Sequence, residues 1–219
     1  MARINWSAID EVIFVARHLI ELACRDSDSL RRHPRLHHIP NGLDPGRFAY
    51  QERTAGPNLA FVGQLSHKKG LMLLMQAFKL LSGQNPELVL HLAGEARELR
   101  YLLYLEQFLR LNGLQERVKY HGWVEDIPAW LADKNYLISC SPFESQGMAV
   151  MEAMLTGIKP LIHPFVGAAD IYPDAWLWND LSQLADLFNG PYQSQQYHDF
   201  VKSRYLLADQ LRKIDEIVE

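Results

Sequence analysis

The amino-acid sequence predicts an α/β fold, a doubly wound parallel sheet with a Rossmann-like order of strands and helices. Short apolar, β-branched segments alternate with longer amphipathic segments, which is typical of a sheet flanked by helices. Several of the short segments end directly at a glycine, as at Gly63, Gly94 and Gly122. Because short right-handed crossovers join successive strands in such folds, we expect the strands to be parallel.

The first predicted elements are short. Residues 12–15 form a strand that is followed by a helix from residue 17 to about 25, and residues 36–39 form a strand that ends at Pro40. The longest early apolar run, residues 12–16, is too short for a signal peptide or a membrane span.

The central part of the chain, residues 58–163, predicts the order β-α-β-α-β-α-β-α-β. Its strands are expected at residues 59–62, 88–93, 118–121, 135–140 and 160–163, and its clearest helices at residues 71–81, 99–112 and 148–156. Trp176 and Trp178 are expected in the core. A last helix carries apolar residues at intervals of 4, 3 and 4, which places them on one face: Leu207, Leu211, Ile214 and Val218.

The composition is that of an ordinary soluble globular protein. Apolar residues make up 48% of the 219 residues and charged residues 22%, with a formal net charge of −4. Without clustered Lys and Arg, a nucleic-acid partner is not expected. Cys140 follows an apolar run and is interpreted as a buried free thiol rather than a partner of Cys24, which favours a reducing, cytoplasmic setting.

The strongest site signal is the segment S-P-F-E-S-Q-G-M-A-V-M-E-A-M-L-T-G at residues 141–157. A glycine at a helix start lets a ligand approach the backbone, and the N–H groups of Gly147 and Met148 would then favour a phosphate. Glu152, one turn later, is placed to bind a ribose diol, and Glu144 to contact a sugar beyond the diphosphate. The alternative is that each glutamate only caps the helix.

A second signal is the segment F-V-G-Q-L-S-H-K-K-G at residues 61–70. It lacks the spacing of a P-loop. Gly63 permits close approach of a ligand, and Lys69 can place a positive charge on a diphosphate. The alternative is a solvated lysine pair, although cations are disfavoured at a helix N-terminus unless an anion lies nearby.

The histidines do not predict a metal site. His33, His37 and His38 have no acidic residue at ligand spacing beside them. His121 and His163 lie at strand ends, where they could line a cleft or pack in the core, and the sequence leaves both interpretations open.

In order and spacing, these motifs resemble glycosyltransferase family 4, whose members have the two-domain GT-B fold. The resemblance rests on the segment N-G-L-D at residues 41–44 with Phe48, residues 63–70, Gly94, residues 118–122 and the two glutamates. It implies that the chain is the C-terminal, nucleotide-sugar-binding domain, residues 28–219, preceded by residues 1–27, which resemble the end of an N-terminal acceptor domain that is otherwise missing.

The resemblance also implies roles for single residues. Lys69 and Glu144 would be catalytic. The diphosphate would contact Gly63, Gln64, Lys69, Gly147 and Met148, and the nucleoside would contact Gly94, Trp123, Val124 and Glu152. Two departures weaken the donor site, since Gln64 stands where the family has an arginine and Gln146 where an aromatic or bulky apolar residue is common.

The expected activity is retaining transfer of a hexosyl group from a nucleotide-sugar to a hydroxyl acceptor, in glycan or cell-envelope polysaccharide synthesis, without metal or cofactor. This part of the enzyme alone is expected to be inactive, and any membrane contact would come through the missing half. Two alternatives are a nucleotide-sugar epimerase of the same architecture and a non-catalytic nucleotide-sugar-binding module.

Overall fold

The computed structural model describes residues 4–218, and its main part is a five-stranded sheet with the strand order β5-β4-β3-β6-β7. All four strand pairs are parallel. The predicted doubly wound sheet is therefore confirmed. Its strands are β3 (Asn58–Val62), β4 (Val89–Ala93), β5 (Val118–Gly122), β6 (Tyr136–Ser139) and β7 (Lys159–Ile162).

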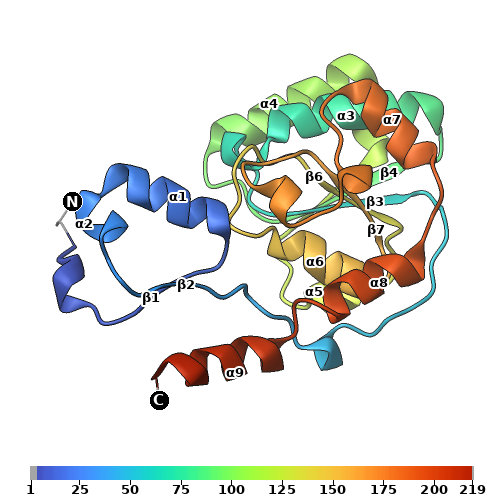
Figure 1. Ribbon diagram of the computed structural model, residues 1–219. Helices are drawn as coiled ribbons and strands as arrows, with labels where there is room; N and C mark the ends of the chain where they lie inside the picture. Colours follow the sequence, from blue (N-terminus) through green and yellow to red (C-terminus); the bar gives the residue numbers. More distant parts are fainter. Residues whose placement is uncertain (1–3, 219) are drawn as a thin grey trace.

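Helices cover both faces of this sheet (Figure 1). One apolar cluster is formed with α3 (Leu71–Gln84), α4 (Leu99–Asn112) and α7 (Leu181–Asn189). A second cluster is formed with the opposite helices: α5 (Ile127–Leu131), α6 (Met148–Leu155) and α8 (Ser194–Lys202).

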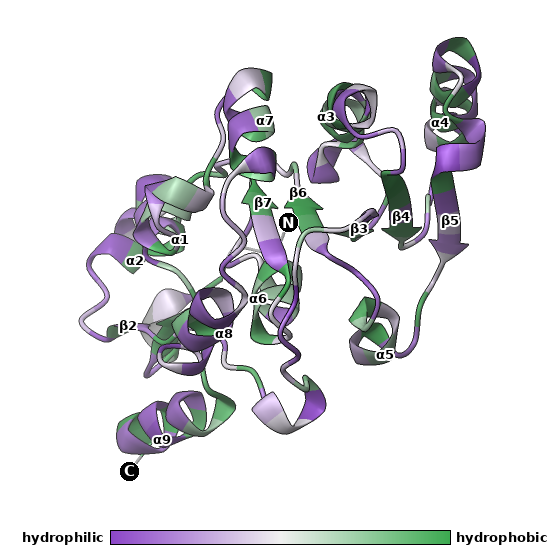
Figure 2. Cartoon of the chain, turned by 90° about the vertical axis from the view of Figure 1, so that its right-hand side faces the viewer, coloured by the Kyte–Doolittle hydropathy of each residue, from purple (hydrophilic) through white to green (hydrophobic). Residues whose placement is uncertain are grey.

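Side chains alternate between the two clusters along the central strands β3 and β6. In β3, Leu59 and Phe61 belong to the first cluster, whereas Ala60 belongs to the second. A strand that is buried on both faces needs apolar residues at every position, which is why the central strands are continuous apolar runs in the sequence. Figure 2 shows the contrast with the edge strand β5, which is hydrophilic and mostly exposed.

Residues before the main sheet form a separate small unit. Strands β1 (Val12–Phe14) and β2 (Leu36–His38) pair in parallel, joined by α1 (Arg17–Asp26) and α2 (Asp28–Arg31). The predicted domain boundary after residue 27 falls between these two helices. The paired strands lie on either side of that position, because a parallel pair requires a crossover such as α1 and α2 between its strands, and the boundary stays a prediction.

The chain enters the region of the main sheet and leaves it again at neighbouring positions. Leu43 forms a parallel bridge with Leu206, just before α9 (Leu207–Val218). As predicted, α9 is amphipathic, but none of its described residues is buried, and Leu211 and Val218 are 52% and 72% exposed. Figure 1 shows that α9 projects away from the five-stranded sheet.

Other expectations about the core are confirmed. Trp176 and Trp178 are buried, and Cys140 is a buried free thiol whose pKa is raised by burial. Among the described helices, none has the length and apolar character needed to cross a bilayer.

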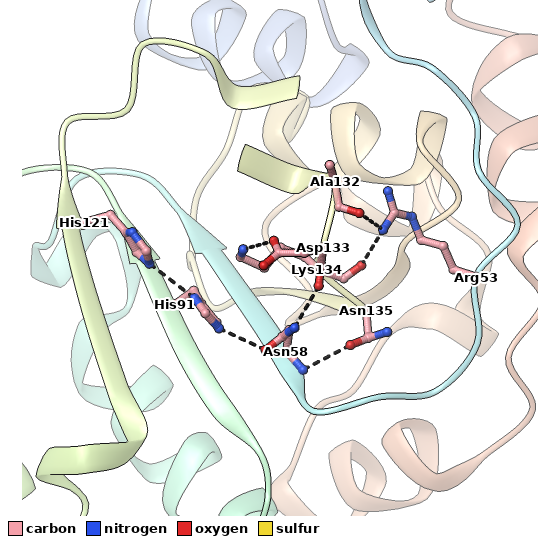
Figure 3. A network of polar contacts seen from close by, with 8 residues as sticks. All are labelled: Arg53, Asn58, His91, His121, Ala132, Asp133, Lys134 and Asn135. Atoms are coloured by element: carbon pink, nitrogen blue, oxygen red, sulfur yellow. Dashed lines mark hydrogen bonds and ion pairs between the residues drawn. The ribbon is translucent and has the colours of Figure 1, made fainter. Parts of the chain in front are cut away.

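A partly buried polar network links β3, β4 and β5 on the face opposite α3 and α4 (Figure 3). Asn58 donates its amide N–H to the carbonyl of Asp133, so its Oδ1 faces His91 and accepts from His91 Nε2 at 3.1 Å. His91 Nδ1 must therefore accept, and its donor is His121 Nε2 at 3.2 Å. Protonation of His91 would reverse this hydrogen bond, and His121 would have to carry its hydrogen on Nδ1 so that Nε2 can accept.

This network predicts acid sensitivity. Burial, followed by the charge of Lys134, lowers the pKa of His91 to about 4, whereas an unfolded histidine titrates near 6.5. The unfolded chain binds more protons between these values, so stability falls as the pH drops from about 6.5 to 4. We expect His91 to contribute about 1–2 kcal/mol of this loss. Urea unfolding at several pH values should show a shallower pH dependence for His91→Leu than for the parent, and identical slopes would contradict the assignment.

Candidate functional site

Two adjoining cavities lie at the carboxyl ends of the central strands, where ligands bind in this fold class. The first, of about 240 Å³, is lined by Gly63, Gln64, Gly94, Trp123 and Val124. The second, of about 150 Å³, is lined by Lys69, Glu144, Gly147 and Met148, and Val62 lines both. The structure thus brings nine of the predicted site residues to one continuous surface.

The turn after β3 places Lys69 in the second cavity. A 3-10 helix, His67–Lys69, ends at Gly70, whose left-handed conformation (φ 72°) begins α3. Lys69 Nζ donates to Glu144 Oε1 at 2.5 Å, and both side chains are only partly exposed. The positive charge of Lys69 therefore lies next to the loop that follows β6, where the Glu144 carboxylate neutralises it.

That loop, residues 141–147 (the 141–147 loop below), is fixed through its carbonyl groups. The carbonyl of Glu144 accepts from His18 Nε2 at 2.9 Å, so His18 must carry its hydrogen on that nitrogen. The Tyr172 hydroxyl lies 3.1 Å from the Gln146 carbonyl and 3.2 Å from the Gly147 carbonyl. His18 and Tyr172 are both buried. The peptide groups are thereby held with their oxygens toward the protein interior.

The N–H groups at the end of this loop have no partner in the described chain. Residues 145–149 donate no backbone hydrogen bond, since Gly147 is the N-cap of α6 and the first turn of a helix leaves its donors free. Gly147 adopts φ 76°, which a glycine reaches without strain. A row of free N–H groups at a helix N-terminus beside a lysine is a site for an anion.

Glu152 differs from the other predicted residues, because it lines neither cavity. It lies on the second turn of α6 and is half-buried, and its side chain forms no hydrogen bond or ion pair with residues 4–218. Burial raises the pKa of its carboxyl, an effect opposed by the charge of Arg47. It is therefore a carboxylate with unused acceptor capacity close to the site.

The two glutamines that depart from the family pattern point in different directions. Gln64 presents a neutral side chain at the first cavity. Gln146 is 1% exposed and directs its amide away from the second cavity, to the backbone of Asn41. His121 and His163 line neither of these two cavities, and His121 bonds to His91 while the His163 ring contacts the Trp178 carbonyl.

Sequence reasoning missed four residues of the site. Glu95 and Arg97 line the first cavity, and their position directly after a strand-ending glycine was a usable signal. His18 and Tyr172 gave none, because they reach the 141–147 loop from 126 and 26 residues away.

Sequence comparison finds relatives that are longer than this chain. It is 29% identical over 177 residues to mannosylfructose-phosphate synthase of Agrobacterium fabrum, a match that covers 73% of this chain and 38% of the relative. It is 28% identical over 141 residues to the GDP-mannose:cellobiosyl-diphosphopolyprenol alpha-mannosyltransferase of Xanthomonas campestris, covering 62% and 37%. The chain thus spans less than two fifths of these two relatives.

Solved structures share the fold. Anabaena Alr3699/HepE, crystallised with UDP and glucose, superposes with a TM-score of 0.81 at 21% identity, over 95% of this chain and 62% of that one. The C-terminal domain of the glycosyl transferase group 1 family protein LpcC from Francisella tularensis gives a TM-score of 0.66 at 21% identity, over 76% of this chain and 100% of that one.

The family match covers the main sheet and both cavities. Residues 56–187 match the family described as Glycosyl transferases group 1, which is more than half of the 219 residues. The match begins just before β3 and ends in α7. This chain belongs to the group 1 glycosyl transferases.

Proposed function

We propose that this chain binds a nucleoside-diphosphate sugar across its two adjoining cavities, as the donor-binding part of a retaining glycosyltransferase. The observation that carries the proposal is the run of free N–H groups at residues 145–149, all of which except Gln146 line the second cavity together with Lys69. A diphosphate there would satisfy groups that otherwise have no partner.

The remaining parts of the donor follow from the shape of the site. The base and ribose occupy the first cavity, beside Gly94, Trp123 and Val124, and the unpaired carboxylate of Glu152 accepts from the ribose diol. The transferred sugar lies against Glu144. This arrangement agrees with the crystallisation of the Anabaena protein with UDP and glucose.

In this arrangement the site accelerates transfer by stabilising the leaving group. Negative charge grows on the diphosphate as the bond to the anomeric carbon breaks, and the fixed N–H donors together with Lys69 are aimed at that charge. The acceptor is a hydroxyl group, and the sugar is a hexose, in line with the mannosyl transfer named for the Xanthomonas relative.

We further propose that the acceptor is held by a domain that this chain lacks, in a protein that makes glycans or cell-envelope polysaccharide. Two observations support this. The chain matches only 38% of the Agrobacterium relative, and the apolar stripe of α9 is uncovered. The unpaired, buried thiol of Cys140 fits a reducing compartment, and we propose the cytoplasm.

A thermal-shift panel tests the proposal. The chain is heated with UDP, GDP, ADP, their nucleosides and their hexose derivatives. A ligand at about a hundred times its dissociation constant adds about 2.7 kcal/mol to the free energy of unfolding. We expect one base to stabilise the protein clearly as its diphosphate and sugar-diphosphate. Absence of stabilisation by every nucleotide would refute donor binding, and turnover of free donor without acceptor would favour an epimerase.

Variants of the two glutamates should distinguish a contact to the ribose from a contact to the transferred sugar. Glu152→Gln is expected to weaken binding of the diphosphate more than binding of its 2′,3′-dideoxy analogue, because the carboxylate accepts from the diol. Glu144→Gln should weaken binding mainly of the sugar-bearing donor, whereas the bare diphosphate should bind no more weakly than to the parent, because the variant removes a negative charge beside Lys69. Calorimetry that finds both variants equal to the parent with every ligand would remove both roles.

A further inference from the structure

Gln146 lies between Ser145 and Gly147, which both line the second cavity, and its side chain lies at the connection between the two units. Its carbonyl shares a peptide plane with the N–H of Gly147, which is among the free donors of residues 145–149. Its amide is buried and fully bonded: Oε1 accepts from the Asn41 N–H at 2.8 Å, and Nε2 donates to the Asn41 carbonyl at 2.8 Å. The second Nε2 hydrogen reaches Met151 Sδ at 3.3 Å. These partners fix the orientation of the amide.

The segment that Gln146 holds is also held from its other side. Gln210, on α9, accepts from the Gly42 N–H at 2.8 Å and lies 3.3 Å from Asn41 Oδ1. Beside it, Leu43 bonds to the backbone of Tyr205 and Leu207. The linker at residues 41–43 is therefore tied on one side to the 141–147 loop and on the other side to α9.

We propose that Gln146 is a positioning residue that couples anion binding at the 141–147 loop to this linker. The inference rests on the proposed function, since the anion is the diphosphate of the donor. The Gln146 carbonyl is held by Tyr172 and shares a peptide plane with the Gly147 N–H, and the Gln146 side chain is held by Asn41, so the direction of the Gly147 N–H depends on both contacts. A diphosphate that binds the N–H groups then restrains Asn41 through two buried hydrogen bonds.

A packing role alone makes a different prediction. If Gln146 only filled space, an apolar side chain of similar length would serve, and any loss of stability would weaken binding of every ligand equally. If Gln146 positions the loop, Gln146→Met leaves the Asn41 N–H and carbonyl without partners and changes binding of the diphosphate but not of the nucleoside, which needs none of the loop N–H groups.

The experiment compares Gln146→Met with the matched control Gln210→Met, which breaks the other tie of the linker. Calorimetry is done with the tightest-binding diphosphate among UDP, GDP and ADP and with its nucleoside. For Gln146→Met we expect diphosphate affinity to fall at least about fivefold, the lower end of coupling between sites, with nucleoside affinity unchanged. Gln210→Met should bind both ligands as the parent does.

Hydrogen exchange on the unmodified chain provides a test that does not depend on the variants folding. Binding of the diphosphate, but not of the nucleoside, should slow exchange of the Asn41 amide. Unchanged exchange in a parent that binds the diphosphate, or equal loss of both ligands in Gln146→Met, would overturn the coupling alone. A parent that binds no diphosphate would overturn the proposed function and the coupling together.

Discussion

Replacing Lys69 by methionine is expected to weaken binding of a nucleoside diphosphate about ten- to hundredfold and to leave nucleoside binding nearly unchanged. The loss corresponds to about 1.5–3 kcal/mol, the range for a hydrogen bond to a charged group. Two effects act in the same direction. The variant removes the positive charge from the anion site, and it leaves the Glu144 carboxylate, now without its ion-pair partner, next to the phosphates.

The neighbouring residue provides the control. Lys68 lies on the same short helix but is exposed and does not line either cavity, so Lys68→Met changes the net charge equally without touching the site. Calorimetry at two salt concentrations should show a loss for Lys69→Met only, and a smaller loss at the higher concentration because Lys69 is partly exposed to solvent. Equal losses in the two variants would mean that Lys69 acts only through the overall charge.

Gly70→Ala is expected to destabilise the fold by about 3 kcal/mol or more. A Cβ atom at this position would lie 2.0 Å from the carbonyl oxygen of Cys140, and the backbone has φ 72°, where alanine is strained. The close approach of Gly70 to the end of β6 is also what brings Lys69 to Glu144. The substitution should therefore impair the anion site as well as the core.

Gly83, within α3, is a glycine at which alanine should increase stability rather than decrease it. A Cβ atom there meets nothing within 4 Å, and Gly83 is not among the glycines with positive φ. Gly83→Ala should stabilise the protein by about 0.5–1 kcal/mol, because alanine loses less entropy than glycine in a helix. Urea unfolding measures both changes as shifts of the midpoint at constant slope. Equal stability of the two variants would refute the packing argument.

The main sheet could be predicted because two features of the sequence mark its strands. Burial on both faces makes them continuous apolar runs, and most end at a glycine or a polar residue. The same regularity located the site, since residues that directly follow parallel strands must meet at one edge. Lys69 and Glu144 were predicted independently and lie 2.5 Å apart at their charged atoms.

Contacts between distant parts of the chain could not be predicted. Nothing in the sequence around His18 indicates that it reaches the carbonyl of Glu144, and the pairing of β2 with β1 depends on a partner strand 24 residues earlier. Gln146 was predicted to weaken the donor site through its polarity. In the structure, the amide of Gln146 forms hydrogen bonds with the backbone of Asn41, 105 residues away.

The bridge between Leu43 and Leu206 has a consequence for how this domain can be moved between proteins. The chain enters the main sheet region and leaves it side by side, with the Leu43 N–H bonded to the Tyr205 carbonyl at 2.8 Å and the Leu207 N–H bonded to the Leu43 carbonyl at 2.9 Å. A domain whose ends meet at one point of its surface can be inserted into a loop of a host protein without stretching either fold. Residues 43–206 could thus be grafted as one insert that carries both cavities, but the graft would leave behind two partners of the 141–147 loop, His18 and Asn41.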